Sequence, residues 1–212
     1  MMKRSFGKSL PRLMAGRMPV LGATALIVLC CAGGSAQHKQ AAAARGAQIE
    51  IDRVRVEIPD LMLLDQDGKK VRFYSDLLKD RVVVMSFFYT SCEYLCSMQG
   101  EVFSKLQALL GERAGKSVFL ISVTLDPATD APEKLKAWGA RYGVKPGWTL
   151  VTGEESEMNR LLVKMTGGSA GRNMHSAVTF IGNDRKGAWV GADGVSAPED
   201  LLKIIDEVEK RP

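Results

Sequence analysis

Two long apolar runs constrain the fold of this chain more than any other feature. The run RVVVMSFFY covers residues 81–89, and VFLISVTL covers residues 118–125. Both are continuous rather than alternating and rich in β-branched and aromatic residues, which is typical of strands buried on both faces. Between them, Met98, Val102 and Leu106 recur at helical spacing. A buried strand, a helix and a second buried strand predict an α/β domain with parallel strands.

Further patterns predict that this parallel core belongs to a mixed sheet flanked by helices. An N-terminal β-hairpin is predicted where Asp65-Gln66-Asp67-Gly68 separates the apolar segments 61–64 and 71–73. Gly182-Asn183-Asp184 predicts the turn of a closing hairpin, which makes the sheet mixed. The remaining predicted strands are 49–59, 148–151, 177–181 and 188–190, and the remaining helices are 130–142, 154–165 and 200–210.

Three local signals mark where these helices begin. Thr90-Ser91 can cap the helix after the first buried strand, because Ser and Thr accept hydrogen bonds from free N–H groups. Asp130-Ala131-Pro132-Glu133 opens the next helix, with a proline near its first turn. Ser196-Ala197-Pro198-Glu199 has the pattern of a capping box and predicts that the last helix starts at Asp200.

The first 36 residues have the pattern of an export segment. All five charged residues before Gln37 are basic, an apolar run follows at residues 18–32, and Gly34-Ser35-Ala36 supplies small residues for cleavage. This pattern is typical of a secretory signal peptide, and an uncleaved membrane anchor is the alternative. We therefore divide the chain into a signal peptide or signal anchor at 1–36, a flexible Ala-rich linker at 37–50 and one folded domain at 51–212.

The net charge of +5 belongs to the export segment alone. The 24 acidic residues all follow Gln37 and are matched in number by the remaining Lys and Arg. A folded domain with balanced charge lacks the basic footprint that nucleic acids require. We therefore expect no nucleic-acid partner.

Cys92 and Cys96 are the reactive candidates of the folded domain, since Cys30-Cys31 lie in the apolar export segment. They follow the carboxyl end of a buried strand, where sites form in α/β sheets, and a helix N-terminus there favours thiolates. Their spacing fits two thiolates on one soft metal, and it fits a disulfide if the first helical turn is loop-like. A structural bridge and inert buried thiols remain alternatives.

His175 is the third candidate. The chain has two histidines, and the other, His38, lies in the predicted linker. His175 directly precedes the predicted strand 177–181, and a lone histidine in such a place is more often structural than a ligand. With two thiolates, however, its imidazole would complete a three-coordinate set suited to copper, because thiolates select Cu(I) and imidazole accepts either state.

Three segments together resemble the Sco/SenC family of copper-binding, thioredoxin-like cytochrome c oxidase assembly factors. They are FFYTSCEYLC at residues 87–96, SVTLDPATDAPEKLKAW at 122–138 and MHSAVTFIG at 174–182. The resemblance implies a thioredoxin-like fold with copper, as Cu(I) or Cu(II), bound by Cys92, Cys96 and His175. It also implies that Asp126 supports the site.

The resemblance further implies periplasmic, membrane-associated delivery of copper to the CuA site of cytochrome c oxidase, in subunit II, or to another copper acceptor. Two alternatives stay open. In the first, the chain is a thiol–disulfide oxidoreductase that reduces the CuA cysteines, with Cys92 attacking and Cys96 resolving. In the second, it is a redox or copper sensor. Glu93 and Ser97 stand where the family usually has proline, which leaves copper affinity and the oxidase target open.

Overall fold

The computed structural model describes residues 58–166 and 178–210, all within the compact unit Ala42–Pro212. The predicted export segment, the linker and His175 lie outside the described residues, as does the predicted strand at 49–59 except for its end. That end, residues 58 and 59, is irregular. In the described part of the chain, no helix is long and apolar enough to cross a membrane.

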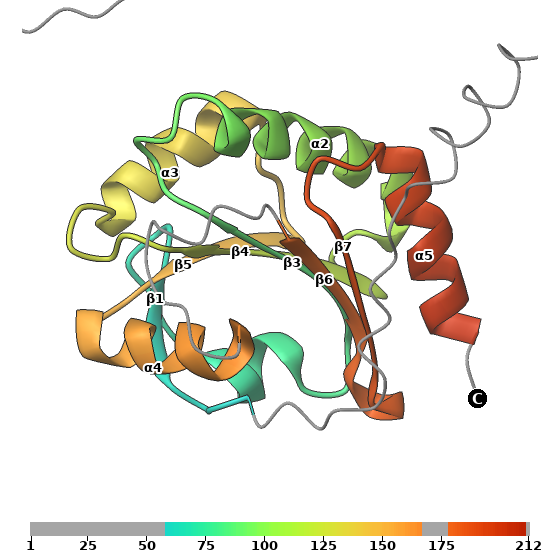
Figure 1. Ribbon diagram of the computed structural model, residues 1–212, viewed down its shortest axis with the longest axis horizontal. Coiled ribbons are helices and arrows are strands. Elements are labelled where there is room, and N and C mark those ends of the chain that lie inside the picture. Colours follow the sequence, from blue (N-terminus) through green and yellow to red (C-terminus); the bar gives the residue numbers. More distant parts are fainter. Residues whose placement is uncertain (1–57, 167–177, 211–212) are drawn as a thin grey trace, which may run out of the picture. The chain divides into compact units, whose positions relative to one another are not determined.

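A seven-stranded mixed sheet forms the centre of this unit, in the order β2-β1-β5-β4-β3-β6-β7 (Figure 1). β3, β4 and β5 are parallel, whereas the N-terminal hairpin β1-β2 and the closing hairpin β6-β7 join them by antiparallel pairing. The α/β class, the mixed sheet and the N-terminal hairpin are thus confirmed. The strands are β1 (Met62–Asp65), β2 (Lys70–Arg72), β3 (Val82–Phe88), β4 (Val118–Thr124), β5 (Trp148–Thr152), β6 (Val178–Asn183) and β7 (Ala188–Asp193).

The two apolar runs form neighbouring central strands, as predicted. β3 and β4 pair in parallel from Val82 opposite Val118 to Phe88 opposite Thr124. Every side chain of β3 is buried, because helices cover both faces of the sheet. The carboxyl ends of β3 and β4 therefore lie together at one edge of the sheet, where the cysteine segment begins.

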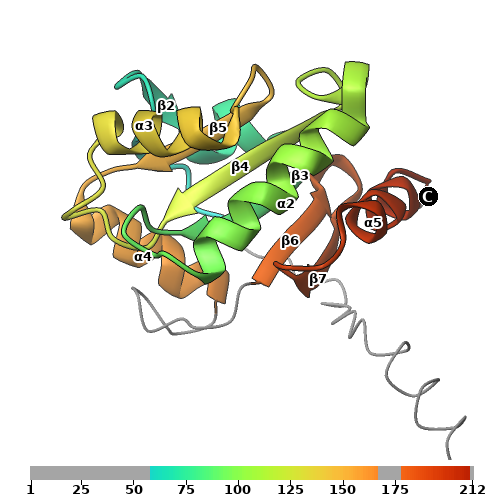
Figure 2. The ribbon, with the colours of Figure 1, turned by 90° about the horizontal axis from the view of Figure 1, so that it is seen from above.

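Helices form a layer on each side of the sheet (Figure 1). α2 (Leu95–Leu110), α3 (Pro132–Tyr142) and α5 (Pro198–Lys210) pack on one face, and α4 (Glu155–Thr166) and a π-helical segment (Phe73–Leu78) pack on the other. Seen from above, α2 crosses the sheet diagonally over its central strands (Figure 2). Aromatic rings fill the space under α2 and α3: Phe88, Phe103, Trp138, Tyr142 and Trp148.

Several predicted boundaries were wrong. α2 begins at Leu95 rather than directly after Thr90-Ser91, because Thr90 is hydrogen-bonded elsewhere. α5 begins at Pro198, two residues before the predicted start. Gly182 and Asn183 belong to β6, and the turn of the closing hairpin lies at Asp184–Lys186. The π-helical segment was not predicted.

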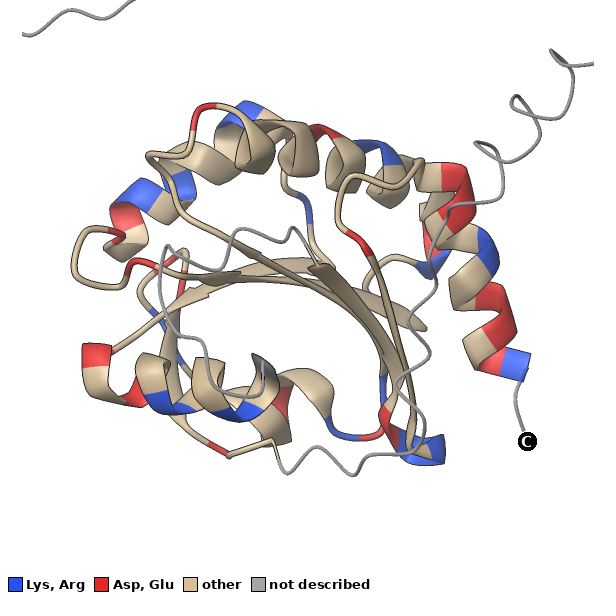
Figure 3. Ribbon diagram, in the orientation of Figure 1, with Lys and Arg blue, Asp and Glu red and all other residues tan. Residues whose placement is uncertain are grey.

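Charged side chains of both signs are interspersed along the helices and loops of the described domain, and the sheet carries few of them (Figure 3). Arg113, in the 3-10 turn that follows α2 (Gly111–Arg113), forms ion pairs with Asp206 and Glu209 of α5 at 2.9 and 2.8 Å. These pairs fasten the two helices on the same face of the sheet. They lie at the opposite end of α2 from the cysteines.

Candidate functional site

The two cysteines occupy the connection between β3 and α2. Cys92 is half-buried and lies in the loop, where its N–H donates to the carbonyl of Tyr89 at 3.1 Å. Cys96 is the second residue of α2 and is only 7% exposed. The loop, rather than a regular helical turn, therefore sets the distance between the two side chains.

This arrangement directs a helix N-terminus at the sulfur of Cys92. The N–H of Cys96 donates to Cys92 Sγ at 3.3 Å, and Ser97 Oγ donates to the carbonyl of Cys92 at 3.5 Å. Free N–H groups at the start of a helix stabilise a negative charge. Both cysteines are free thiols, so the structure shows the reduced pair.

The two thiols differ strongly in acidity. Burial alone would raise the pKa of Cys92, but hydrogen bonds from the S–H and N–H of Cys96 outweigh it, and the pKa lies below its ordinary value. Burial raises the pKa of Cys96 to about 12, and the hydrogen bond from its thiol to Cys92 adds to the effect. Cys92 is therefore the more acidic thiol of the pair.

Behind the cysteine loop lies a buried carboxylate whose role was not predicted from the sequence. Asp130 is 0% exposed and accepts hydrogen bonds from the N–H of Thr90 at 3.0 Å and from its hydroxyl. Thr124, at the end of β4, donates its hydroxyl to Asp130 Oδ2 at 2.6 Å. Asp130 was predicted only to open a helix; the residue that precedes α3 is Ala131.

Asp126 lies two residues beyond the end of β4, at the same edge of the sheet as the cysteine loop. It is 7% exposed, its N–H donates to Thr124 Oγ1 at 3.0 Å, and its carbonyl accepts from the N–H of Asp130 at 2.9 Å. Asp126 is thus joined to the cysteine loop through Thr124, Asp130 and Thr90. Whether it supports bound copper stays a prediction.

Two exposed apolar side chains lie close to the cysteines in the sequence. Tyr94 is 74% exposed and Met98, one turn further along, is 42% exposed. Met98 shares the helical spacing of Val102 and Leu106 but, unlike Leu106, is not buried. Glu93 and Ser91 are also exposed, so the exposed side chains next to Cys92 in the sequence are both polar and apolar.

His175 cannot be placed against these thiols because it lies outside the described residues. Within residues 58–166 and 178–210, no three His, Cys, Asp or Glu side chains are grouped so that they could hold a metal ion. The described cysteines supply two sulfur donors on one side of the sheet. Such a pair can bind one soft metal ion with help from a further ligand, or it can form and break a disulfide.

Comparisons with known proteins identify the family and the fold of the chain. The sequence model of the family described as SCO1/SenC matches residues 53–169, which is more than half of the chain and contains Cys92, Cys96 and Asp126 but not His175. The SCO1 protein homolog of Bacillus subtilis is 32% identical over 121 residues, which are 56% of this chain and 61% of that protein. The chain therefore aligns with less than two thirds of that relative's length.

Solved structures confirm the thioredoxin-like fold. BsSco, described as a member of the Sco family of cytochrome c oxidase assembly proteins with a disulfide switch, superimposes with a TM-score of 0.61 and 25% identity. The match covers 74% of this chain and 95% of BsSco. Copper-bound ScoI of Bradyrhizobium japonicum superimposes with a TM-score of 0.56 and 22% identity, over 69% of this chain and 96% of ScoI.

Proposed function

The chain belongs to the SCO1/SenC family, and from this premise we propose that it is an exported copper chaperone. In this proposal Cys92, Cys96 and His175 hold one copper ion, which is cargo rather than a resident cofactor. The acceptor is the CuA site of cytochrome c oxidase subunit II or another copper-binding protein. The oxidase is proposed because BsSco is described as a member of a family of oxidase assembly proteins.

The observation that supports the proposal most strongly is the dithiol at the start of α2. Cys96 N–H lies 3.3 Å from Cys92 Sγ, so the helix N-terminus favours a thiolate there. Thiolates are soft ligands, and Cu(I) is one of the metals that they favour, beside zinc and iron–sulfur clusters. Copper bound to ScoI, a relative of the same fold, adds support for the same cargo.

Transfer of the cargo requires an open route to the metal. A set of two sulfurs and one imidazole leaves room for an incoming thiolate, so that the acceptor can replace one ligand at a time. Cys92 is the more exposed thiol and is the natural point of first contact, whereas Cys96 is buried in the first turn of α2. We infer that Cys96 leaves the metal last.

Export and membrane attachment belong to this proposal as well. The segment at residues 1–36 would carry the domain to the periplasm and, if uncleaved, hold it at the inner membrane. A test is fractionation of cells that express the full chain with a C-terminal tag. Periplasmic or membrane recovery supports the proposal, and recovery in the cytoplasm contradicts it.

The copper function is tested by titrating the reduced full-length protein with Cu(I) under anaerobic conditions in competition with a chromogenic chelator. We expect about one Cu(I) per chain, and strong loss of binding in Cys92→Ser and in Cys96→Ser. Ser104→Ala is the matched control, because it changes a serine further along α2 and leaves the cysteine loop intact. Equal binding by the wild type and both cysteine variants would contradict the proposal.

The second candidate function, thiol–disulfide exchange, is favoured by the difference in acidity between the two thiols. The Cys92 thiolate would attack a partner disulfide, forming a mixed disulfide and releasing one partner thiolate. Cys96 would then lose its proton to that thiolate and attack Cys92 Sγ, which releases the second partner thiolate. The partner gains two electrons, and Cys92 and Cys96 become a disulfide.

One comparison separates the two candidate functions. A copper chaperone requires His175, whereas an oxidoreductase requires only the two cysteines. The rate of reduction of a model disulfide peptide should therefore fall in Cys92→Ser and be unchanged in His175→Ala if exchange is the function. A sensor would need an output surface, and the described residues provide no observation that favours one.

A further inference from the structure

We propose that Asp130 is a positioning residue for the dithiol. Its buried carboxylate fixes Thr90, and through Thr90 it fixes Cys92 relative to the start of α2. This inference rests on the proposed function in that copper is the cargo whose binding it controls. It concerns a residue that lies outside the cysteine loop itself and that was not among the predicted site residues.

Asp130 holds Thr90 through two hydrogen-bond donors at once. The backbone N–H of Thr90 donates to Asp130 Oδ2 at 3.0 Å, and the Thr90 hydroxyl donates to Oδ1. A two-point contact to a carboxylate fixes orientation as well as distance. Thr90 lies beyond the end of β3 and before α2, so neither element supplies a partner for its N–H.

Asp130 is itself held in place by the central strand β4 and the residues that follow it. Thr124 of β4 donates to Asp130 Oδ2, and the Asp130 N–H donates to the carbonyl of Asp126. β4 is held against β3 up to this point, since the N–H of Leu125 donates to the carbonyl of Phe88 at 2.7 Å. The Asp130 carboxylate therefore fixes the position of the cysteine loop relative to the central strands of the sheet.

Thr90 is close to Cys92 in the chain, so its position affects that of Cys92 Sγ. Cys92 follows two residues later, and its N–H donates to the carbonyl of Tyr89 across Thr90. A shift of Thr90 therefore moves Cys92 and changes the contact between Cys92 Sγ and the Cys96 N–H. That contact, at 3.3 Å, is the geometric basis of the proposed site.

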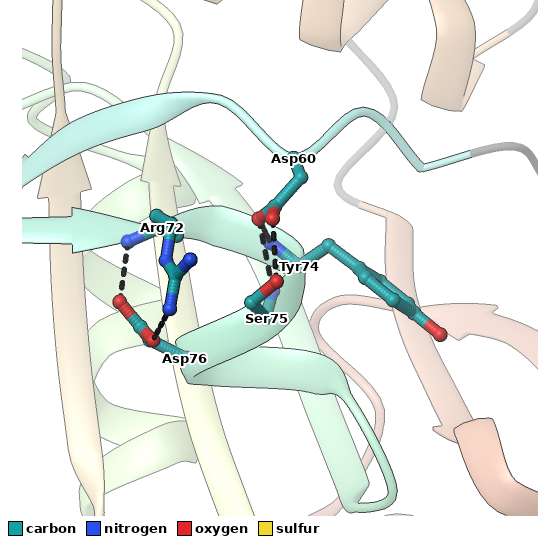
Figure 4. A network of polar contacts seen from close by, with 5 residues as sticks. All are labelled: Asp60, Arg72, Tyr74, Ser75 and Asp76. Atoms are coloured by element: carbon teal, nitrogen blue, oxygen red, sulfur yellow. Dashed lines mark hydrogen bonds and ion pairs between the residues drawn. The ribbon is translucent and has the colours of Figure 1, made fainter.

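Stability alone is a poor explanation for this carboxylate. A fully buried charge is costly to desolvate, and replacing buried ionic groups by apolar ones is often neutral or stabilising. Asp60 accepts the same kinds of hydrogen bond as Asp130 but is exposed to solvent. Its donors are the N–H groups of Tyr74 and Ser75 and the Ser75 hydroxyl (Figure 4). Asp60 arranges the same donors at the start of the π-helical segment, on the other face of the sheet and in contact with solvent.

The test compares variants of Thr90 in the full-length protein. Thr90→Val removes the hydroxyl donor with little change of volume, and Thr90→Ser restores it. Asp130→Asn removes the charge, but it can fail to fold, so the Thr90 pair carries the test. Ser75→Ala is the matched control, because it removes the same kind of bond to Asp60; Ser122→Ala controls for loss of stability in the core.

Three quantities are measured for each variant. They are the dissociation constant for Cu(I) by chelator competition, the rate constant for alkylation of Cys92 by iodoacetamide at one fixed pH, and the free energy of unfolding in urea. We expect Thr90→Val to weaken Cu(I) binding about tenfold, because a hydrogen bond to a charged group is lost. Alkylation of Cys92 should slow several-fold, and Thr90→Ser should return both values to within about twofold of the wild type.

Ser75→Ala and Ser122→Ala should leave both functional values unchanged within about twofold, although Ser122→Ala lowers stability. The inference is overturned if Thr90→Val behaves as Ser122→Ala does, with stability reduced and both functional values intact. It is also overturned if Thr90→Ser fails to rescue. If the wild type binds no Cu(I), the copper proposal fails by itself, and the alkylation rates still decide whether Asp130 positions Cys92.

Discussion

A buried polar contact between the central strands leads to a quantitative prediction. Ser122 of β4 accepts a hydrogen bond from Trp148 Nε1 at 3.0 Å and shares a second with Ser86 of β3 at 2.9 Å. All three residues are at most 2% exposed. Ser122→Ala therefore leaves two buried polar groups without their partner, whereas Ser86→Ala leaves the bond between Ser122 and Trp148 in place.

The expected cost follows from the number of groups left unsatisfied. A buried polar group without a partner costs about 1–3 kcal/mol, so Ser122→Ala, which leaves two such groups, should lower the free energy of unfolding by about 2–6 kcal/mol. Ser86→Ala removes one neutral bond and should cost about 1 kcal/mol. In the double variant the Ser86 hydroxyl is gone, so its cost should be no greater than that of Ser122→Ala alone.

Equilibrium unfolding in urea, followed by tryptophan fluorescence, measures these differences. The slope against urea should stay constant, because the core keeps its size, and the midpoint should fall. The double variant should be less destabilised than the sum of the two single variants by about 1 kcal/mol or more. Additive effects, or a larger cost for Ser86→Ala than for Ser122→Ala, would refute the reasoning.

Three further predictions follow from the described geometry. In the reduced protein at neutral pH, iodoacetamide should modify Cys92 and leave Cys96 unmodified, because the pKa of Cys92 is lowered and that of Cys96 is about 12. Peptide mass spectrometry measures the labelling of each cysteine, and faster labelling of Cys96 would contradict this prediction. Cys96→Ala should slow the alkylation of Cys92 at pH 7, because the pKa of Cys92 rises when the Cys96 thiol no longer donates to it. Cys96→Ser should slow alkylation less, and equal rates in the wild type and both variants would exclude that hydrogen bond. Gly147→Ala should unfold at a much lower urea concentration than Gly143→Ala, because a Cβ on Gly147 would lie 2.4 Å from the backbone nitrogen of Gly115. A Cβ on Gly143 meets open space, so Gly143→Ala should lower the free energy of unfolding by only about 1 kcal/mol. Similar unfolding midpoints would show that the backbone at Gly147 can move to accept the Cβ.

The central strands could be predicted because their signal is local and strong. Residues 81–89 and 118–125 are continuous apolar runs, and covering both faces of the sheet removes such strands from water. The cysteine pair could be found in the same way, since its position after a strand is visible in the sequence. The thioredoxin-like fold came from the resemblance of three motifs, not from periodicity.

The start of α2 and the role of Asp130 could not be predicted, because both depend on a contact between distant residues. Thr90 has the local signature of a helix cap, but its donors bind a carboxylate 40 positions later. Asp130 in turn has the local signature of a helix start. The π-helical segment depends on Asp60, which lies 14 positions before the N–H group it accepts.

The proposed function requires that Cys92, Cys96 and His175 bind one copper ion. The most direct measurement is the copper content and Cu(I) affinity of the reduced full-length protein beside His175→Ala and His38→Ala, which alter the two histidines of the chain separately. We expect about one copper per chain in the wild type and in His38→Ala, with binding strongly weakened in His175→Ala. Wild-type protein without copper, or His175→Ala with unchanged affinity, would contradict it.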